Sequence, residues 1–298
     1  KVQALRATFK MNPSEYYRHD RVPKSKVAVN SELEWEEKRL ADLKAIRSTL
    51  EENEEDRQSD PSIPRRGLVY MDDSKKDDRV KVAISTGDVD HAKHVSTILP
   101  GMNNVPSEDI NDHVKNAELV HKHAADNAHI SQDQVATIAW MYDTPQGGQV
   151  MSSKYATKAS HEIGSALEGM HAFRHTNGIE RAHTSLLGHS YGSTTAGKVA
   201  KMIRKGVLDD LVMYGSPGAG AHDAREYNLD HGRPYVSGIK SDDAVKGKGT
   251  LNSKFGNNPM FMPGVKHLAN NSERDRLFFI PWKMFDRHSE YLEEGTSS

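Results

Sequence analysis

Residues 186–197 read LLGHSYGSTTAG, and this stretch decides the fold that the sequence predicts. Within it, Gly188, Ser190 and Gly192 form the pattern G-x-S-x-G, which is typical of a nucleophilic serine on a sharp turn between a strand and a helix. The apolar residues before the pattern predict a buried strand, and the small residues after it predict a helix. We expect a strained backbone at Ser190. The flanking glycines are needed because a Cβ atom there would collide with the neighbouring strand or helix.

Short apolar segments alternate with helical segments over most of the chain, which is typical of a mostly parallel α/β sheet. The sequence predicts strands at residues 68–70, 80–84, 94–99, 134–141, 183–189, 211–215 and 235–239. It predicts helices at residues 106–127, 152–177 and 192–204. Residues 244–276 are rich in Gly, Asn, Lys and Pro, so we expect an irregular excursion there, and whether it forms a lid is left open.

The first part of the chain has a different, more polar character. We interpret residues 1–65 as a helical extension and linker, and residues 66–298 as the catalytic domain. A helix is predicted over residues 31–55, and the charged run 51–60 predicts a linker that ends at Pro61. The apolar stripe of this helix consists of Leu33, Leu40, Leu43, Ile46 and Leu50.

That stripe could dock the helix on the catalytic domain, or it could form a coiled coil or an arm that binds a partner. The stripe spans only about three heptads, which is short for a coiled coil. We therefore favour a solvated helix that lies on the catalytic domain.

A serine nucleophile needs a base to remove its proton and an acid to orient that base. In α/β-hydrolases these residues follow the serine in the order Asp or Glu, then His. Here Asp242 and Asp243 come after the last predicted strand, and His288 lies near the C-terminus. We favour Asp243 over Asp242 as the acid, and His288 as the base for Ser190.

Other histidines and acids also follow the serine. His222 and His231 precede the favoured acid and would break the expected order, and His267 lies in the irregular excursion. Asp223 and Asp230 follow an earlier strand, where an aspartate is most often a helix cap. These five residues are therefore weaker candidates.

An oxyanion hole should be built from backbone N–H groups, with the start of the following helix adding a favourable dipole. We expect one donor from Tyr191 and the other from the turn at residues 100–102, most plausibly from Met102. Gly101 lets the chain approach a substrate closely. We expect Gly101, His189 and Pro217 to line the substrate pocket.

Several motifs together resemble one known family. They are Gly87-Asp88, His94-Val95, Leu99-Pro100-Gly101, Ile138-Ala139-Trp140, Tyr142-Asp143-Thr144-Pro145, Gly188-His189-Ser190-Tyr191-Gly192-Ser193-Thr194, Tyr214-Gly215-Ser216-Pro217-Gly218, Phe255-Gly256, Pro259 and His288-Ser289-Glu290-Tyr291. Over residues 67–293 the chain is similar to an actinobacterial α/β-hydrolase family long catalogued as a domain of unknown function. The resemblance implies an α/β-hydrolase fold and a serine hydrolase with Ser190, Asp243 and His288 at the triad positions.

The sequence departs from that family's pattern at two places. Met102-Asn103-Asn104 stands in the oxyanion turn where small or hydroxyl residues are expected, and the acid position is doubled as Asp242-Asp243. The family itself does not specify a substrate.

These features predict a carboxylesterase-type serine hydrolase that needs no cofactor and no metal. The alternatives are an amidase or peptidase that uses the same triad, or a hydrolase-fold protein that binds a ligand or partner without turnover. A mean hydropathy of −0.74 favours small or soluble esters over triglycerides.

Composition bears on the possible binding partners, on cysteine chemistry and on membrane spans. The net charge of −2 gives no drive toward nucleic acid, and the absence of cysteine excludes disulfides and thiolate chemistry. No apolar run reaches the roughly 18 residues of a membrane span. Because the chain starts at Lys1, we expect a processed or truncated N-terminus, and we leave the compartment and oligomeric state open.

Two histidine pairs could suggest a metal site. The pairs are His91 with His94 and His121 with His123. Neither pair has a convincing third ligand, so we interpret all four residues as surface histidines.

Overall fold

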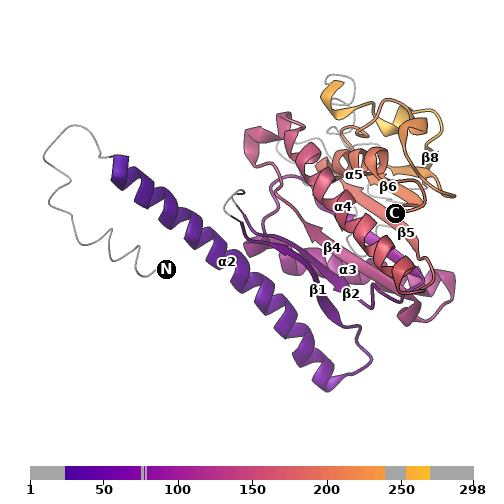
Figure 1. The fold of residues 1–298 in the computed structure, drawn as a ribbon, viewed down its shortest axis with the longest axis horizontal. Helices are drawn as coiled ribbons and strands as arrows, with labels where there is room; N and C mark the ends of the chain where they lie inside the picture. The colour runs from indigo at the N-terminus through magenta and orange to yellow at the C-terminus, as the bar shows by residue number, and fades with distance from the viewer. Residues whose placement is uncertain (1–23, 75–76, 78, 239–252, 269–298) are drawn as a thin grey trace, which may run out of the picture.

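The computed structural model of the protein describes residues 24–74, 77, 79–238 and 253–268. One eight-stranded sheet forms its centre, and helices cover both faces (Figure 1). The strands are β1 (Arg66–Asp72), β2 (Lys81–Thr86), β3 (His94–Leu99), β4 (Val135–Met141), β5 (His183–His189), β6 (Asp210–Tyr214), β7 (Pro234–Ser237) and β8 (Lys266–His267). The helices are α2 (Lys24–Ser59), α3 (Pro106–Ala128), α4 (Lys154–Thr176) and α5 (Tyr191–Met202). Short helical turns are η2 (Gln132–Gln134), η3 (Gly147–Met151), η4 (Ala224–Glu226), η5 (Ser253–Phe255) and η6 (Pro259–Phe261).

The strands lie in the order β1-β2-β4-β3-β5-β6-β7-β8. Strand β2 runs antiparallel to both of its neighbours, and every other adjacent pair is parallel. This arrangement confirms the predicted mostly parallel sheet flanked by helices. Parallel strands end at one common edge, so the residues that follow β3, β5 and β6 gather there.

The two faces of the sheet carry separate apolar cores. On one face, Ile138 and Trp140 of β4 pack with residues of α4 and α5 such as Ile163 and Val199. On the other face, Met141 packs with residues of α3 and with Ile46 of α2. Every residue of β2 and β4 is buried, because helices cover both faces and successive side chains point in opposite directions.

Two predictions about the regions outside the central strands are wrong. The charged residues 51–59 belong to α2 and not to a linker, because Glu, Lys and Arg are good helix formers on a solvated face. The excursion predicted as irregular contains β8, whose two exposed residues pair with β7. Backbone pairing with β7 and the contact of Lys266 with the ring of Tyr235 hold this short strand, so it carries no alternating hydrophobic pattern.

Helix α2 lies on the domain as expected, and Leu43, Ile46 and Leu50 of the predicted stripe pack against the core, but buried polar residues share the contact. The side chain of Leu40 is 40% exposed, whereas Asp42, Thr49 and Asn53 are almost fully buried together with Ile46. The docking face of the second half of α2 therefore combines apolar residues of the stripe with buried polar side chains. Figure 1 shows this second half beside β1 and β2, while the first half extends past the sheet.

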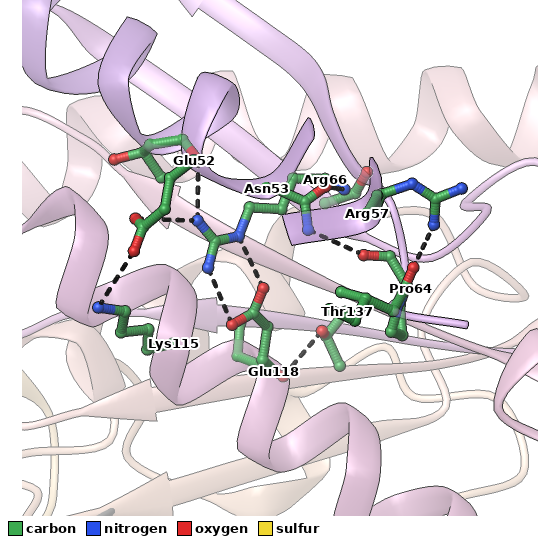
Figure 2. A network of polar contacts seen from close by, with 12 residues as sticks. Glu52, Asn53, Arg57, Pro64, Arg66, Lys115, Glu118 and Thr137 are labelled. Atoms are coloured by element: carbon green, nitrogen blue, oxygen red, sulfur yellow. Dashed lines mark hydrogen bonds and ion pairs between the residues drawn. The ribbon is translucent and has the colours of Figure 1, made fainter. Parts of the chain in front are cut away.

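Arg66 at the start of β1 joins α2 to α3 through a buried network (Figure 2). Its guanidinium donates two parallel hydrogen bonds to Glu118, at 2.7 and 3.0 Å, and a third to the carbonyl of Thr49 at 2.8 Å. Its backbone N–H donates to Asn53 at 2.8 Å, and Asn53 in turn donates to the carbonyl of Pro64 at 3.2 Å. The network fixes the C-terminal half of α2 and the connection into the sheet.

A second polar contact lies nearer the N-terminus of the same helix, at Asp42. The fully buried carboxylate of Asp42 accepts hydrogen bonds from the side chain of Arg79 and from the backbone N–H groups of Val80 and Ser107. Ser107 lies in the first turn of α3, where unpaired N–H groups and the helix dipole favour a negative charge. Asp42 therefore ties α2 to β2 and to the start of α3.

Replacing Arg66 should weaken this docking measurably. Arg66→Met removes the additional donor to the carbonyl of Thr49 and leaves Glu118 without its cation, so we expect a loss of about 3 kcal/mol in the free energy of unfolding. The control is Arg47→Met, which removes an exposed pair with Glu51 on the same helix and should cost less than about 0.5 kcal/mol. Urea unfolding of the full chain measures both. Equal losses in the two variants would contradict the role assigned to Arg66.

Candidate active site

Ser190 lies on a sharp turn between β5 and α5. Strand β5 ends at His189 and α5 begins at Tyr191, so a single residue connects them. The backbone of Ser190 has φ 50° and ψ −123°, a conformation that side-chain-bearing residues rarely adopt. Its N–H donates to the carbonyl of Tyr214 at the end of β6, at 2.9 Å. The strained turn predicted for this position is therefore present, and strain of this kind is typical of functional sites.

The glycines around Ser190 permit backbone contacts that a side chain would block. A Cβ atom on Gly188 would lie 2.6 Å from the carbonyl oxygen of Gly192, and one on Gly192 would lie 2.4 Å from the carbonyl oxygen of Pro100. Both contacts are shorter than any real Cβ contact. The predicted reason for the glycines is thus confirmed: Gly188 faces the new helix, and Gly192 faces the end of β3.

Gly101 brings the turn after β3 against the serine. A Cβ atom on Gly101 would lie 3.1 Å from the Cβ of Ser190 and 3.5 Å from its Oγ atom. The same atom would lie 3.5 Å from Nδ1 of His189. Gly101, His189 and Ser190 are therefore neighbours at the carboxyl edge of the sheet.

A chain of buried hydroxyl groups hydrogen-bonds to the backbone carbonyl of Ser190. The buried Oγ of Ser193 lies 2.6 Å from the carbonyl oxygen of Ser190 and 2.6 Å from Oγ of Ser216. The N–H of Gly218 donates to Ser216 Oγ at 3.2 Å. Because a hydroxyl has one proton, the chain runs from Gly218 to Ser216, then to Ser193 and to the Ser190 carbonyl. Sequence reasoning missed this support, although both serines lie in motifs that it singled out.

The turn that departs from the family pattern has a clear structural role. Asn103 adopts φ 62°, a left-handed conformation that asparagine tolerates better than most residues. Its N–H donates to the carbonyl of Pro145 at 3.0 Å, and its side-chain oxygen accepts from Gly147 at 2.8 Å. Asn104 donates to the carbonyl of Met102 at 2.9 Å. The two asparagines therefore shape this turn, and the first ties it to the loop after β4.

Residues after β4 brace the same turn from behind. Thr144 donates to the carbonyl of Asn104 at 2.7 Å, and the hydroxyl of Tyr142 donates to the carbonyl of Pro100 at 3.2 Å. Burial raises the pKa of the Tyr142 hydroxyl well above its usual range, so it remains a donor. The motif that links Tyr142, Thr144 and Pro145 thus supports the turn that begins at Pro100.

The side chains of the two predicted oxyanion residues meet in one apolar cluster. Tyr191 is 1% exposed, and its hydroxyl donates to the carbonyl of Ser152 at 2.6 Å. Its ring contacts Phe255 edge-on at 5.9 Å, and burial raises the pKa of its hydroxyl to about 12. Met102 packs against this cluster, together with Val150 and Tyr155. The cluster forms an apolar wall next to the serine turn.

The other two predicted pocket residues, His189 and Pro217, lie at the end of β5 and in the loop after β6. The ring of His189 stacks on Tyr214 of β6, with centroids 5.3 Å apart and an angle of 22° between the planes. Pro217 is buried in the loop after β6, directly after Ser216. One of them therefore comes from the strand that leads into Ser190, and the other from the loop after the neighbouring strand.

Of the predicted triad, only Ser190 lies in the described part of the chain. Asp242, Asp243 and His288 fall outside the described residues, so their roles remain predictions. Among the weaker acids, Asp223 caps η4 and pairs with Arg225, whose hydrogen bonds lower the pKa of that carboxyl to about 2. Asp230 lies 3.6 Å from Arg181. Both acids have structural partners.

One prediction about the histidine pairs is wrong. His91, His94 and His123 are exposed as expected, but His121 is 1% exposed. Its position is explained by helix α3, because Val114, Ala117, His121 and Ala125 recur at helical spacing on the buried face. In the described ranges, no three His, Asp or Glu side chains are arranged to hold a metal ion. No helix there has the length and apolar character needed to cross a bilayer.

Comparison with known proteins identifies the class. The sequence profile of a family described as alpha/beta hydrolase matches residues 75–253. The chain is 30% identical over 242 residues to an uncharacterized protein of Mycobacterium tuberculosis (strain ATCC 25618 / H37Rv), and the match covers 78% of this chain and 84% of that relative. The protein therefore belongs to this alpha/beta hydrolase family. A second uncharacterized M. tuberculosis protein is 34% identical over 184 residues. That match covers 58% of this chain and 26% of that relative.

Solved structures with distant similarity include two hydrolases. Dienelactone hydrolase from Anabaena variabilis ATCC 29413 has 11% identity and a TM-score of 0.37 over 69% of this chain and 86% of that chain. Phospholipase/carboxylesterase from Dyadobacter fermentans DSM 18053 has 16% identity and a TM-score of 0.39 over 62% and 84% of the two chains. Scores this low add nothing to the family assignment.

The close backbone approach at Gly192 can be tested by adding one methyl group. Gly192→Ala must displace α5 or the end of β3, so we expect a loss of about 2 kcal/mol in the free energy of unfolding. The matched control is Gly169→Ala on α4, where an added Cβ meets no atom within 4 Å. That change should stabilise the protein by up to about 1 kcal/mol. Thermal and urea unfolding compare the two, and a neutral Gly192→Ala would show that the contact is not tight.

Proposed function

We propose that this protein is a serine hydrolase that cleaves acyl esters of small or soluble substrates through an acyl-enzyme intermediate. The observation that carries the proposal is the geometry of Ser190. This residue has a strained backbone, lies at the start of a helix, and has the backbone of Gly101 beside its hydroxyl. A serine held in this way suits nucleophilic attack, because its hydroxyl is positioned before substrate binds.

In the proposed mechanism, Ser190 Oγ attacks the acyl carbonyl carbon while His288 accepts the serine proton. The tetrahedral intermediate collapses, the bond to the alcohol oxygen breaks, and His288 returns the proton to that oxygen. Water then attacks the acyl-enzyme with the same base, which releases the carboxylic acid and restores Ser190. Asp243 orients His288 and stabilises its imidazolium. The scheme uses no cofactor.

The developing oxyanion would accept hydrogen bonds from the backbone N–H groups of Tyr191 and Met102. Three features support these donors: the N-terminal position of Tyr191 in α5, the braced turn that holds Met102, and the packing of both side chains in one cluster. Rigid donors stabilise the transition state because they need no reorganisation during the reaction. Gly101, His189 and Pro217 are the proposed lining of the acyl or alcohol pocket.

Steady-state hydrolysis tests this assignment. The full chain should hydrolyse p-nitrophenyl acetate faster than p-nitroacetanilide, because the ester is the proposed substrate class. Ser190→Ala and His288→Ala should each lower kcat/KM for the ester by about 10³-fold or more. Asp243→Asn should lower it more than Asp242→Asn.

The control is His267→Ala, which removes an exposed histidine that also follows Ser190 in the sequence. It should leave kcat/KM unchanged. A loss of activity in His267→Ala, together with normal activity in His288→Ala, would assign His267 as the base. Faster cleavage of the anilide would favour an amidase, and no turnover of either substrate would favour a binding protein.

A further inference from the structure

A cleft of about 740 Å³ lies at the end of the sheet opposite Ser190. Its walls come from the connection after α2 at residues 61–65, the residues after β2, and the turn η2 before β4. Lys93 and Gln134 of its lining precede β3 and β4, whereas Ser190 follows β5. Strand β5 has seven residues, so the cleft lies roughly 20 Å or more from the serine. A molecule in this cleft would not touch the proposed active site.

His121 of α3 lines this cleft and also a smaller adjoining hollow of about 310 Å³. Its side chain is 1% exposed, and neither ring nitrogen has a hydrogen-bond partner among the described residues. The hydroxyl of Thr86, which lines the smaller hollow, is also buried and without a partner there. Buried polar groups are nearly always paired, so two such groups beside one opening point to a missing partner.

The backbone at the end of β2 makes room for the histidine ring. Gly87 has φ 85°, and a Cβ atom on it would lie 3.1 Å from Cε1 of His121 and 2.7 Å from the carbonyl oxygen of Val135. Any other residue at this position would press on the ring and on β4. The imidazole is therefore held against the end of β2 by packing and by the nearby backbone of Thr86, whose interaction with the ring falls short of a regular hydrogen bond.

The protonation state of His121 limits what it can bind. Burial lowers the pKa of the His121 imidazole, so the ring is neutral near pH 7. A neutral imidazole has one N–H donor and one acceptor nitrogen. A simple carboxylate or phosphate offers only acceptors, so it would leave the acceptor nitrogen unpaired. A partner that both donates and accepts would satisfy both.

The rest of the lining suits a small organic molecule and not an ion. Pro61, Ile63 and Pro64 contribute apolar surface. The cation of Arg57 is engaged by the carbonyl of Ile63, and Asp88 is paired with His91 at 2.8 Å. Arg65, Lys93 and Asp133 also line the cleft, and Arg65 pairs with Glu54 at 2.9 Å, so acidic and basic groups are mixed around the opening.

We propose that this cleft and the adjoining hollow together form a second binding site, which takes a small uncharged molecule with a hydrogen-bond donor beside an acceptor, such as a carboxamide or a lactam. His121 and Thr86 are its polar partners, and residues 61–65 form its apolar wall.

Nitrogen-15 NMR of the full chain, labelled at histidine, reads the site directly. The probes are nicotinamide as a carboxamide and uracil as a lactam, with acetate as the acceptor-only control. We expect at least one of the two probes to shift both ring-nitrogen resonances of His121 in a saturable way, and we expect acetate to shift neither. The variant His121→Phe assigns the His121 resonances and should abolish probe binding. The control is His123→Phe, which replaces an exposed histidine on the same helix and should leave binding intact.

Thr86→Val supplies a variant that keeps the shape of the core. Losing one hydrogen bond should weaken probe binding about tenfold. Ser190→Ala should leave probe binding unchanged, which separates this site from the proposed hydrolase activity. The proposal is overturned if neither probe shifts the His121 resonances, if acetate binds equally well, or if Thr86→Val has no effect on affinity.

Discussion

The close approach of two backbones at the carboxyl edge of the sheet is the constraint on which the rest of the site depends. The end of β3 at Leu99 and Pro100 lies so near the first turn of α5 that only a glycine fits at position 192. The same crowding at Gly188 forces the chain to change from strand to helix within one residue. Ser190 takes the strained conformation because the close contacts at Gly188 and Gly192 leave no room for the chain to turn with relaxed dihedral angles.

Hydrogen bonds from three other segments maintain this arrangement. The carbonyl of Tyr214 accepts from the N–H of Ser190, and Ser193 and Ser216 hold the serine carbonyl. The loop after β4 fixes the turn at residues 100–104 from the other side. Each contact is ordinary in strength, but together they maintain a backbone geometry that costs on the order of 1–3 kcal/mol at one residue. The strain is local, and it falls on the residue proposed as nucleophile.

The opposite edge of the sheet is organised by buried charge. Arg66 and Asp42 attach α2 through bonds to α3, β1 and β2, and these polar contacts lie beside the leucine stripe that the sequence predicts. Breaking one partner of such a network is costly, because the other is left buried without compensation. The attachment of α2 is therefore specific in its geometry, and it creates one wall of the distal cleft.

Local pattern was enough to predict the elbow, the main strands and three helices, because these features depend on neighbours in the sequence. The polar part of the docking face of α2 could not be predicted in this way, since the partners of Asp42 lie 37 to 65 residues further along the chain. The polar residues Lys122 and His123 next to His121 predict a surface position for it. Its helical spacing from Ala117 and Ala125 instead indicates the buried face. The turn at Met102 departs from the expected residues, and its asparagines are explained only by contacts with the loop after β4. The roles of Asp243 and His288 remain predictions from chain order.

Reaction of the full chain with a fluorophosphonate probe, followed by digestion and peptide mapping, tests the central claim most directly. Such probes form a stable bond only with an activated serine, so the label reports the nucleophile and its base together. The account predicts one label per chain, located on Ser190, and no label in the His288→Ala variant. A folded protein that takes up no label, or takes it up at another serine, would contradict the assignment of Ser190.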